Sequence, residues 1–150
     1  MWLLQTKPDR KWDHRFLEMA ELVATWSKDP STKVGAVIVD QRNRIIATGF
    51  NGFPRGCDDS TVERDVKLLR TIHAEENALL FAQRNVSDMF LYVTRPPCAR
   101  CAAKIVQAGI ARVVYPLPPL DFTERWGAEM AQAAKMFFEG QVAVEVVGEQ

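Results

Sequence analysis

Four side chains in two short stretches have the residue types and spacing of a metal-dependent catalytic site. His73 and Glu75 stand two residues apart, and Cys98 and Cys101 stand three apart, directly after Pro96-Pro97. An imidazole and two thiolates are ligands that zinc prefers, and catalytic zinc sites combine three protein ligands with a fourth position for water. A carboxylate beside such a site can transfer protons as a general acid or base. The sequence therefore indicates hydrolysis at a zinc centre.

The spacing also predicts where the metal lies. Residues two apart in mid-helix point roughly 200° apart, so His73 and Glu75 can approach one ion only if it lies beyond the helix N-terminus. Cys98 and Cys101 share one face in the first turn of a second helix, which Pro97 opens. Helix N-termini carry positive partial charge and free N–H groups, which favour thiolates. We expect two helix N-termini to converge on one ion, with Glu75 as the proton shuttle.

Other interpretations of these residues explain less. A C-x-x-C pair is also typical of thioredoxin-like redox proteins, but that interpretation leaves His73 and Glu75 unexplained. A zinc-stabilised binding module without activity would have no need of Glu75. Glu76 is interpreted as a solvated or supporting carboxylate. A second zinc site using Cys57 and His14 lacks further ligands, so Cys57 is expected to be a free thiol.

Length and composition restrict the class of protein. The chain has 150 residues, 47% hydrophobic and 25% charged, which predicts one domain over residues 1–150 with a proper core. The 19 basic residues equal the 19 acidic ones, which argues against a nucleic-acid-binding protein. No apolar run is long enough for a membrane span, and residues 1–8 do not resemble a signal peptide. Three cysteines without a secretory signal favour the cytoplasm.

Hydrophobic periodicity predicts a chain in which helices and strands alternate, and therefore the α/β class. Strands are expected at 34–39, 44–50, 89–94, 111–115 and 142–147, and helices at 11–28, 73–84, 98–108 and 121–138. The first two strands should form a hairpin, and the last three should be parallel neighbours because a helix separates each pair. Residues 51–60 are rich in Gly, Pro, Asn and Asp and predict a loop, which continues into a charged stretch at 63–70.

Four stretches together resemble the deoxycytidylate (dCMP) deaminases of the cytidine deaminase superfamily. The His-x-Glu and Pro-Cys-x-x-Cys motifs are shared by zinc-dependent nucleobase deaminases generally. Two further segments are similar to the dCMP branch in particular, namely Asp29–Lys33 (DPSTK) and Asn51–Gly56 (NGFPRG). The resemblance covers about residues 12 to 115. It implies a three-layer fold with a central five-stranded mixed sheet flanked by helices.

The resemblance also implies roles for individual residues. His73, Cys98 and Cys101 would bind one Zn²⁺ per chain, and Glu75 would be the catalytic residue. Asn51 would bind the sugar, and the N–H of Ala74 would hold the cytosine O2. The reaction would convert dCMP to dUMP, the precursor for thymidylate synthesis.

Phosphate recognition and regulation are assigned to the flanking segments. Ser31, Thr32 and Lys33 offer two hydroxyls and an ammonium to a phosphate, while Arg55, Arg64 and Arg70 are alternative partners. By resemblance, the chain would form a homo-oligomer, with a hexamer favoured, activated by dCTP with Mg²⁺ and inhibited by dTTP. The effector loop would comprise Gly49, Asn51, Gly52, Phe53, Arg55 and Gly56, where glycines let the backbone approach phosphate.

The motifs give the least information about the identity of the substrate. After Tyr115 the chain departs from the family pattern, and Pro116–Pro119 is unusually rich in proline. Nucleotides of 5-methyl- or 5-hydroxymethylcytosine are therefore alternative substrates to dCMP. A tRNA or a free base is a further alternative, although the neutral net charge disfavours tRNA.

Overall fold

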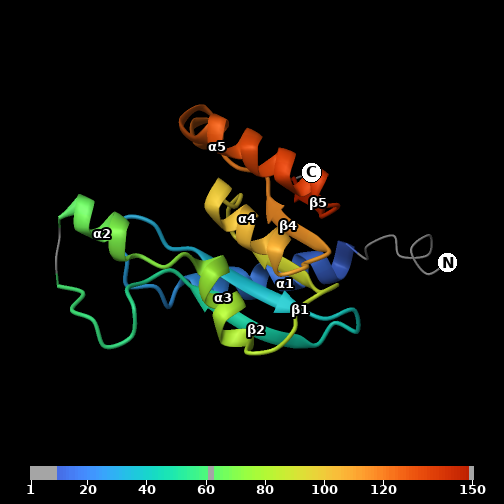
Figure 1. Cartoon of the computed structure of the whole chain (residues 1–150), viewed down its shortest axis with the longest axis horizontal. Helices are drawn as coiled ribbons and strands as arrows, with labels where there is room; N and C mark the ends of the chain where they lie inside the picture. Colours follow the sequence, from blue (N-terminus) through green and yellow to red (C-terminus); the bar gives the residue numbers. More distant parts are fainter. Residues whose placement is uncertain (1–9, 61–62, 149–150) are drawn as a thin grey trace.

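A single sheet with helices on both faces forms the frame of the computed structural model in Figure 1, which describes residues 10–60 and 63–148. The strands are β1 Gly35–Val39, β2 Ile45–Phe50, β3 Phe90–Val93, β4 Arg112–Pro116 and β5 Ala143–Val147. The helices are α1 Arg10–Ala24, α2 Arg64–Arg70, α3 Ala74–Ala82, α4 Ala99–Gln107 and α5 Leu120–Glu139. The α/β class and the five-stranded sheet are thus confirmed.

The strand order is β2-β1-β3-β4-β5, and the sheet is mixed. The β1–β2 hairpin is antiparallel, and β1 also pairs antiparallel with β3. Parallel pairing joins β3 to β4 and β4 to β5, as the intervening helices predicted. The hairpin contains an irregularity between Ile38 and Val39, immediately before the turn at Asp40.

Two apolar layers cover the two faces of the sheet. On one face, α1 contributes Phe16, Ala20 and Val23, which pack against strand side chains such as Val37 and Val114. On the other face, α3, α4 and α5 contribute the helix side of a larger cluster that includes Ile38, Leu91 and Val113 of the strands. All five residues of β1 are buried, which confirms that this strand is covered on both sides. The three-layer arrangement is the expected one.

Two elements differ from the sequence prediction. The first helix ends at Ala24, not near residue 28, because Thr25, Trp26 and Ser27 donate to carbonyls three residues back and tighten the chain. The charged stretch at 63–70 contains a helix, α2, which Figure 1 shows at one end of the molecule. None of its residues is buried, so it has no apolar periodicity that the sequence could reveal.

No helix within residues 10–60 and 63–148 is long and apolar enough to cross a membrane. The prediction made for residues 1–8 lies outside the described part of the chain.

Candidate active site

His73 lies at the start of α3, where the fold fixes it from two sides. It is the N-cap residue, with extended backbone angles, and Ala74 is the first helical residue. The preceding residue, Ile72, forms a two-way backbone bridge with Gly52, in which N–H to carbonyl distances are 2.8 and 3.0 Å. This bridge attaches the start of α3 to the chain that leaves β2.

Cys98 occupies the same position in α4 that His73 occupies in α3. It is the N-cap residue, and its Sγ accepts a hydrogen bond from the Cys101 N–H at 3.5 Å. The segment that leads to it leaves β3 at Thr94, whose Oγ1 and N–H bond to the backbone of Gly35 at 3.2 and 3.1 Å. Both helices that carry candidate ligands therefore begin at one edge of the sheet.

The two helix starts bring His73, Cys98 and Cys101 into one cluster. Their ligand atoms all lie within 4.8 Å of one another, and they form the one such cluster among the described residues. The Nδ1 atom of His73 lies 3.6 Å from the Cys98 Sγ and 3.3 Å from the Cys101 Sγ. Ordinary zinc bond lengths in a tetrahedral site would separate such N and S atoms by about 3.6 Å. The donor set and its dimensions therefore fit zinc.

The two thiols differ in acidity. Hydrogen bonds from Cys101, and a further one with His73, lower the pKa of Cys98 to about 4. Burial acts in the opposite direction. The hydrogen bond with Cys98, together with burial, raises the pKa of the Cys101 thiol. The Cys98 hydrogen bond also raises the pKa of His73, against the effect of burial. A divalent cation between them would stabilise both sulfurs as thiolates.

Glu75 is a buried carboxylate beside this cluster but not part of it. It is the second residue of α3 and is only 5% exposed, and no carboxylate belongs to the cluster. Burial raises the pKa of Glu75 to about 7, although its backbone hydrogen bond and the His73 charge act in the opposite direction. A group with this acidity can both accept and donate a proton near neutral pH.

Asn51 holds the predicted phosphate segment in place. Its side-chain oxygen accepts from the Val34 N–H, and its Nδ2 donates to the Thr32 carbonyl, each at 2.9 Å. The structure thus brings Asn51 and Thr32 together. The amide keeps one donor hydrogen and one acceptor lone pair for a further partner.

The segment from Ser31 to Lys33 is a turn built on Asp29. The Asp29 Oδ1 accepts from the N–H groups of Ser31 and Thr32 at 2.8 and 3.1 Å. Lys67 of α2 lies 3.7 Å from the same oxygen, so α2 braces this turn. Lys33 is exposed, which leaves its ammonium accessible to a ligand.

A cavity of about 710 Å³ lies between this turn, the loop after β2 and α2. Ser31, one of the predicted phosphate-binding residues, lines this cavity. Most of the predicted effector loop lines it as well, namely Asn51, Gly52, Phe53, Arg55 and Gly56. Lys28 and Lys67 line it too, although Lys28 also pairs with Asp59 at 3.5 Å. Among the described residues, His73, Cys98 and Cys101 do not line this cavity.

Gly49 has a different surrounding from the rest of the predicted effector loop. It lies within β2, and a Cβ at this position would be 2.3 Å from the Ala78 nitrogen and 2.4 Å from the Ala74 carbonyl. The residue therefore allows α3 to pack directly on β2.

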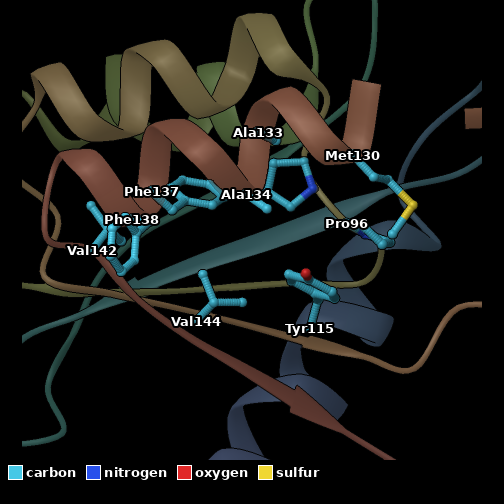
Figure 2. Close-up of a pocket in the computed structure, with 10 residues that line it drawn as sticks. Pro96, Tyr115, Met130, Ala133, Ala134, Phe137, Phe138, Val142 and Val144 are labelled. Atoms are coloured by element: carbon cyan, nitrogen blue, oxygen red, sulfur yellow. The ribbon is translucent and has the colours of Figure 1, made fainter. Parts of the chain in front are cut away.

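A second cavity, of about 280 Å³, lies between α5 and the β4–β5 edge of the sheet. Figure 2 shows Met130, Phe137 and Phe138 of α5 opposite Tyr115 and Val144. Within the described part of the chain, its lining is mostly apolar and contains no charged residue and no cluster of metal ligands, so this cavity does not suggest chemistry.

Sequence reasoning missed several polar contacts at the site. Glu76 accepts from the His73 N–H at 2.9 Å and from the Lys104 Nζ at 2.5 Å. Glu129 of α5 accepts from the Ala99 N–H, at the start of α4, at 3.2 Å. The Glu three residues after an N-cap is a known capping signal and could have identified the His73–Glu76 contact. The other partners are distant in sequence and left no local signal.

Cys57 is exposed and is a free cysteine, as expected. No second metal cluster involving it or His14 occurs among residues 10–60 and 63–148.

Fold and cluster together are typical of zinc-dependent deaminases. A family sequence model described as the cytidine and deoxycytidylate deaminase zinc-binding region matches residues 10–117. The chain belongs to this family. Its likeness to the deoxycytidylate branch is confirmed by a human relative named deoxycytidylate deaminase, 38% identical over 116 residues.

Two more comparisons support this assignment. A relative from Aliivibrio fischeri, named an uncharacterized deaminase in the luxG 3′ region, is 53% identical over 91% of this chain and 92% of its own. A crystal structure of the dCMP deaminase from cyanophage S-TIM5, in complex with dCMP and dUMP, has a TM-score of 0.73 at 25% identity. That match covers 93% of this chain and 99% of the phage chain. The human match covers 70% of this chain but only 64% of the human relative's length.

Proposed function

We propose that the chain catalyses the hydrolytic deamination of dCMP to dUMP and ammonia, and thereby supplies thymidylate synthesis. The observation that carries the proposal is the His73, Cys98 and Cys101 cluster, whose ligand atoms lie within 4.8 Å of one another at two helix N-termini. Membership of the cytidine and deoxycytidylate deaminase family supports the same reaction. The cyanophage relative, whose structure contains dCMP and dUMP, supports the choice of substrate.

The proposed roles follow from the positions of the residues. One zinc ion per chain, held by the cluster, would supply Lewis-acid activation of the attacking water. Glu75 accepts a proton from that water, delivers it to the ring nitrogen, and assists the departure of ammonia. Ala74 is the first residue of α3, so its N–H has no acceptor within the helix and is suited to the cytosine O2. Water and dCMP are consumed, and dUMP and ammonia are formed.

Nucleotide recognition is assigned to the turn at Ser31–Lys33 and to Asn51. The Asn51 amide would share its remaining hydrogen-bonding capacity with the sugar. Ser31, Thr32 and Lys33 would bind the phosphate, since Lys33 is exposed and the turn is held by Asp29.

The test is ammonia release from a panel of substrates by the zinc-loaded protein. The panel comprises dCMP, deoxycytidine, dCTP, cytidine, free cytosine, 5-methyl-dCMP, 5-hydroxymethyl-dCMP and a tRNA anticodon stem. We expect kcat/KM for dCMP to exceed that for deoxycytidine at least tenfold, and Lys33→Ala to raise KM for dCMP alone. Equal turnover of deoxycytidine and dCMP would contradict phosphate recognition, and a higher rate on a modified nucleotide would transfer the assignment to that substrate.

Regulation by dCTP with Mg²⁺ and by dTTP is proposed to act through the 710 Å³ cavity. Cations from three segments line it, namely Lys28, Arg55 and Lys67, and the acidic Asp29 and Asp59 lie beside them. This combination suits a triphosphate and its divalent cation. Calorimetric titration of dCTP and Mg²⁺ into protein saturated with dUMP tests the assignment. Simultaneous binding supports an effector site, whereas mutual exclusion would make the cavity part of the substrate site.

We also propose that residues 1–150 fold as one deaminase domain, act in the cytoplasm, and assemble into a homo-oligomer, with a hexamer favoured. Exposed leucines support assembly, since Leu69 of α2 is 87% exposed and Leu80 of α3 is 62% exposed. Sedimentation velocity with and without dCTP measures the state directly, and a monomer under both conditions would contradict it.

A further inference from the structure

Glu76 connects the two helices that carry the candidate metal ligands. Its Oε1 accepts from the backbone N–H of His73 at 2.9 Å, within α3. Its Oε2 accepts from the Nζ of Lys104 at 2.5 Å, and Lys104 belongs to α4. One carboxylate therefore caps the helix that begins after His73 and holds the helix that begins after Cys98.

The position of Lys104 makes this contact relevant to the metal site. Lys104 lies three residues after Cys101 in α4, so the two side chains emerge from neighbouring turns on one side of the helix. A zinc site of two sulfurs from α4 and one nitrogen from α3 requires the two helix starts to keep a fixed separation. Sub-ångström changes in that separation alter bond lengths that zinc holds within about 0.2 Å.

We propose that Glu76 and Lys104 are positioning residues, which hold His73 at the correct distance from Cys98 and Cys101 for metal binding. This inference rests on the zinc site of the proposed function. Neither residue touches the metal; Glu76 acts through the His73 backbone, and Lys104 acts through Glu76.

If Glu76 and Lys104 formed only an ordinary surface ion pair, its removal would have little effect on the protein. The Lys104 side chain is 50% exposed, and exposed pairs contribute little to folding. The Glu76 side chain is 22% exposed, however, and its carboxylate is already oriented by the His73 N–H. The pair therefore loses less conformational freedom than two mobile side chains would, and its main effect falls on ligand geometry.

The experiment measures zinc affinity by competition with a chromogenic chelator, in wild type, Lys104→Met, Glu76→Gln and the double variant. Methionine keeps the apolar stem of lysine, and glutamine keeps an acceptor for the His73 N–H. We expect each single variant to bind zinc roughly three- to tenfold more weakly, somewhat less than the 10- to 100-fold typical of groups that contact a ligand directly. The double variant should be no weaker than the weaker single variant, because both changes remove one interaction.

Two further variants separate positioning from folding. Lys104→Arg keeps the ion pair and should restore wild-type zinc affinity, while Lys135→Met removes an exposed lysine of α5 and should leave affinity unchanged. The inference is overturned if Lys104→Met binds zinc within twofold of the wild-type affinity. It is also overturned if Lys104→Arg loses as much zinc affinity as Lys104→Met. Additive losses in the double variant overturn it as well.

The same titrations distinguish this inference from the proposed function. His73→Ala should lose tight zinc binding altogether. If His73→Ala binds zinc as wild type does, the metal site itself is wrong. If only Lys104→Met behaves as wild type, the metal site stands and the positioning role fails.

Discussion

Asp13 and Arg112 form a bidentate ion pair between α1 and β4, 99 residues apart in sequence. The two N–H···O distances are 2.8 and 2.7 Å, and the side chains are 2% and 10% exposed. The Tyr92 hydroxyl of β3 donates to the same Asp13 Oδ1 at 2.9 Å. Burial and the Asp13 charge together raise the pKa of Tyr92, so it remains a donor at physiological pH. One carboxylate thus attaches α1 to two central strands.

Removal of this carboxylate should destabilise the fold strongly. We expect Asp13→Ala to lower the free energy of unfolding by about 3–5 kcal/mol, because Arg112 would stay buried without its bidentate partner and would keep only the longer contact to Glu145, at 3.7 Å. The paired replacement Asp13→Leu with Arg112→Met should recover most of the loss, since two apolar side chains of similar size leave no buried charge. Urea denaturation of both variants checks this. An exposed Glu18→Gln variant in α1 is the control, and equal stability of Asp13→Ala and that control would contradict the prediction.

The elements that carry the chemistry could be predicted because their signals are local. A strand rich in β-branched residues ends at Val39, and Pro97 and the spacing of two cysteines mark the start of α4. The spacing of His73 and Glu75 places them at a helix tip for geometric reasons alone, and His73 is indeed the N-cap of α3. The helix starts therefore followed from the sequence.

The remaining features depend on pairs that are distant along the chain. Nothing local connects Glu76 with Lys104, 28 residues away, or identifies β3 as the antiparallel neighbour of β1. The helix α2 escaped prediction because it buries none of its residues and is held by Lys67 at Asp29, on which the Ser31–Lys33 turn is built. Partner choice of this kind is decided by packing in three dimensions, which periodicity does not encode.

Gly49 offers a test of how closely α3 must approach the sheet. A methyl group in Gly49→Ala would meet the α3 backbone at Ala78 and Ala74, where only backbone movement gives room. We expect a loss of about 1–3 kcal/mol in the free energy of unfolding and weaker zinc binding, because the candidate ligand His73 caps α3. Thermal unfolding and chelator competition measure the two effects.

Gly127 of α5 is the matched control for this substitution. A Cβ there meets nothing within 4 Å, and the residue lies inside a helix. Gly127→Ala should therefore stabilise the protein by about 0.5–1 kcal/mol without changing zinc affinity. Similar behaviour of the two variants would show that the approach of α3 to β2 tolerates a side chain.

Asp40 should make stability depend on pH. Burial opposes its ionisation, but hydrogen bonds from Arg44 and Arg42 outweigh that effect and hold the pKa of this carboxyl below its ordinary value. The unfolded chain therefore binds this proton more tightly than the folded one. The stabilising contribution is present above the unfolded pKa of about 3.9 and is lost as pH falls through the folded pKa.

The variant Asp40→Asn makes this dependence measurable. It should lower the free energy of unfolding by about 1 kcal/mol at pH 7, and the difference from wild type should begin to shrink below about pH 3.9 and disappear only below the folded pKa. Denaturation at several pH values from about 7 down to about 2, with Glu18→Gln as the control, gives the curve. A difference that stays constant over this range would show that the charge of Asp40 contributes nothing.

Glu75 allows the chemical step to be separated from metal binding. Glutamine is nearly isosteric with this buried side chain, which lies outside the His73, Cys98 and Cys101 cluster, so Glu75→Gln should retain one zinc per chain. Without a group that accepts and returns the proton, kcat should fall by about 10²- to 10⁴-fold. Metal content by mass spectrometry and dUMP formation from dCMP provide the two measurements. Cys101→Ser is the comparison variant, because it should lose zinc together with activity. Loss of zinc from Glu75→Gln would identify the carboxylate as a ligand, and unchanged turnover would remove it from the proton-transfer step.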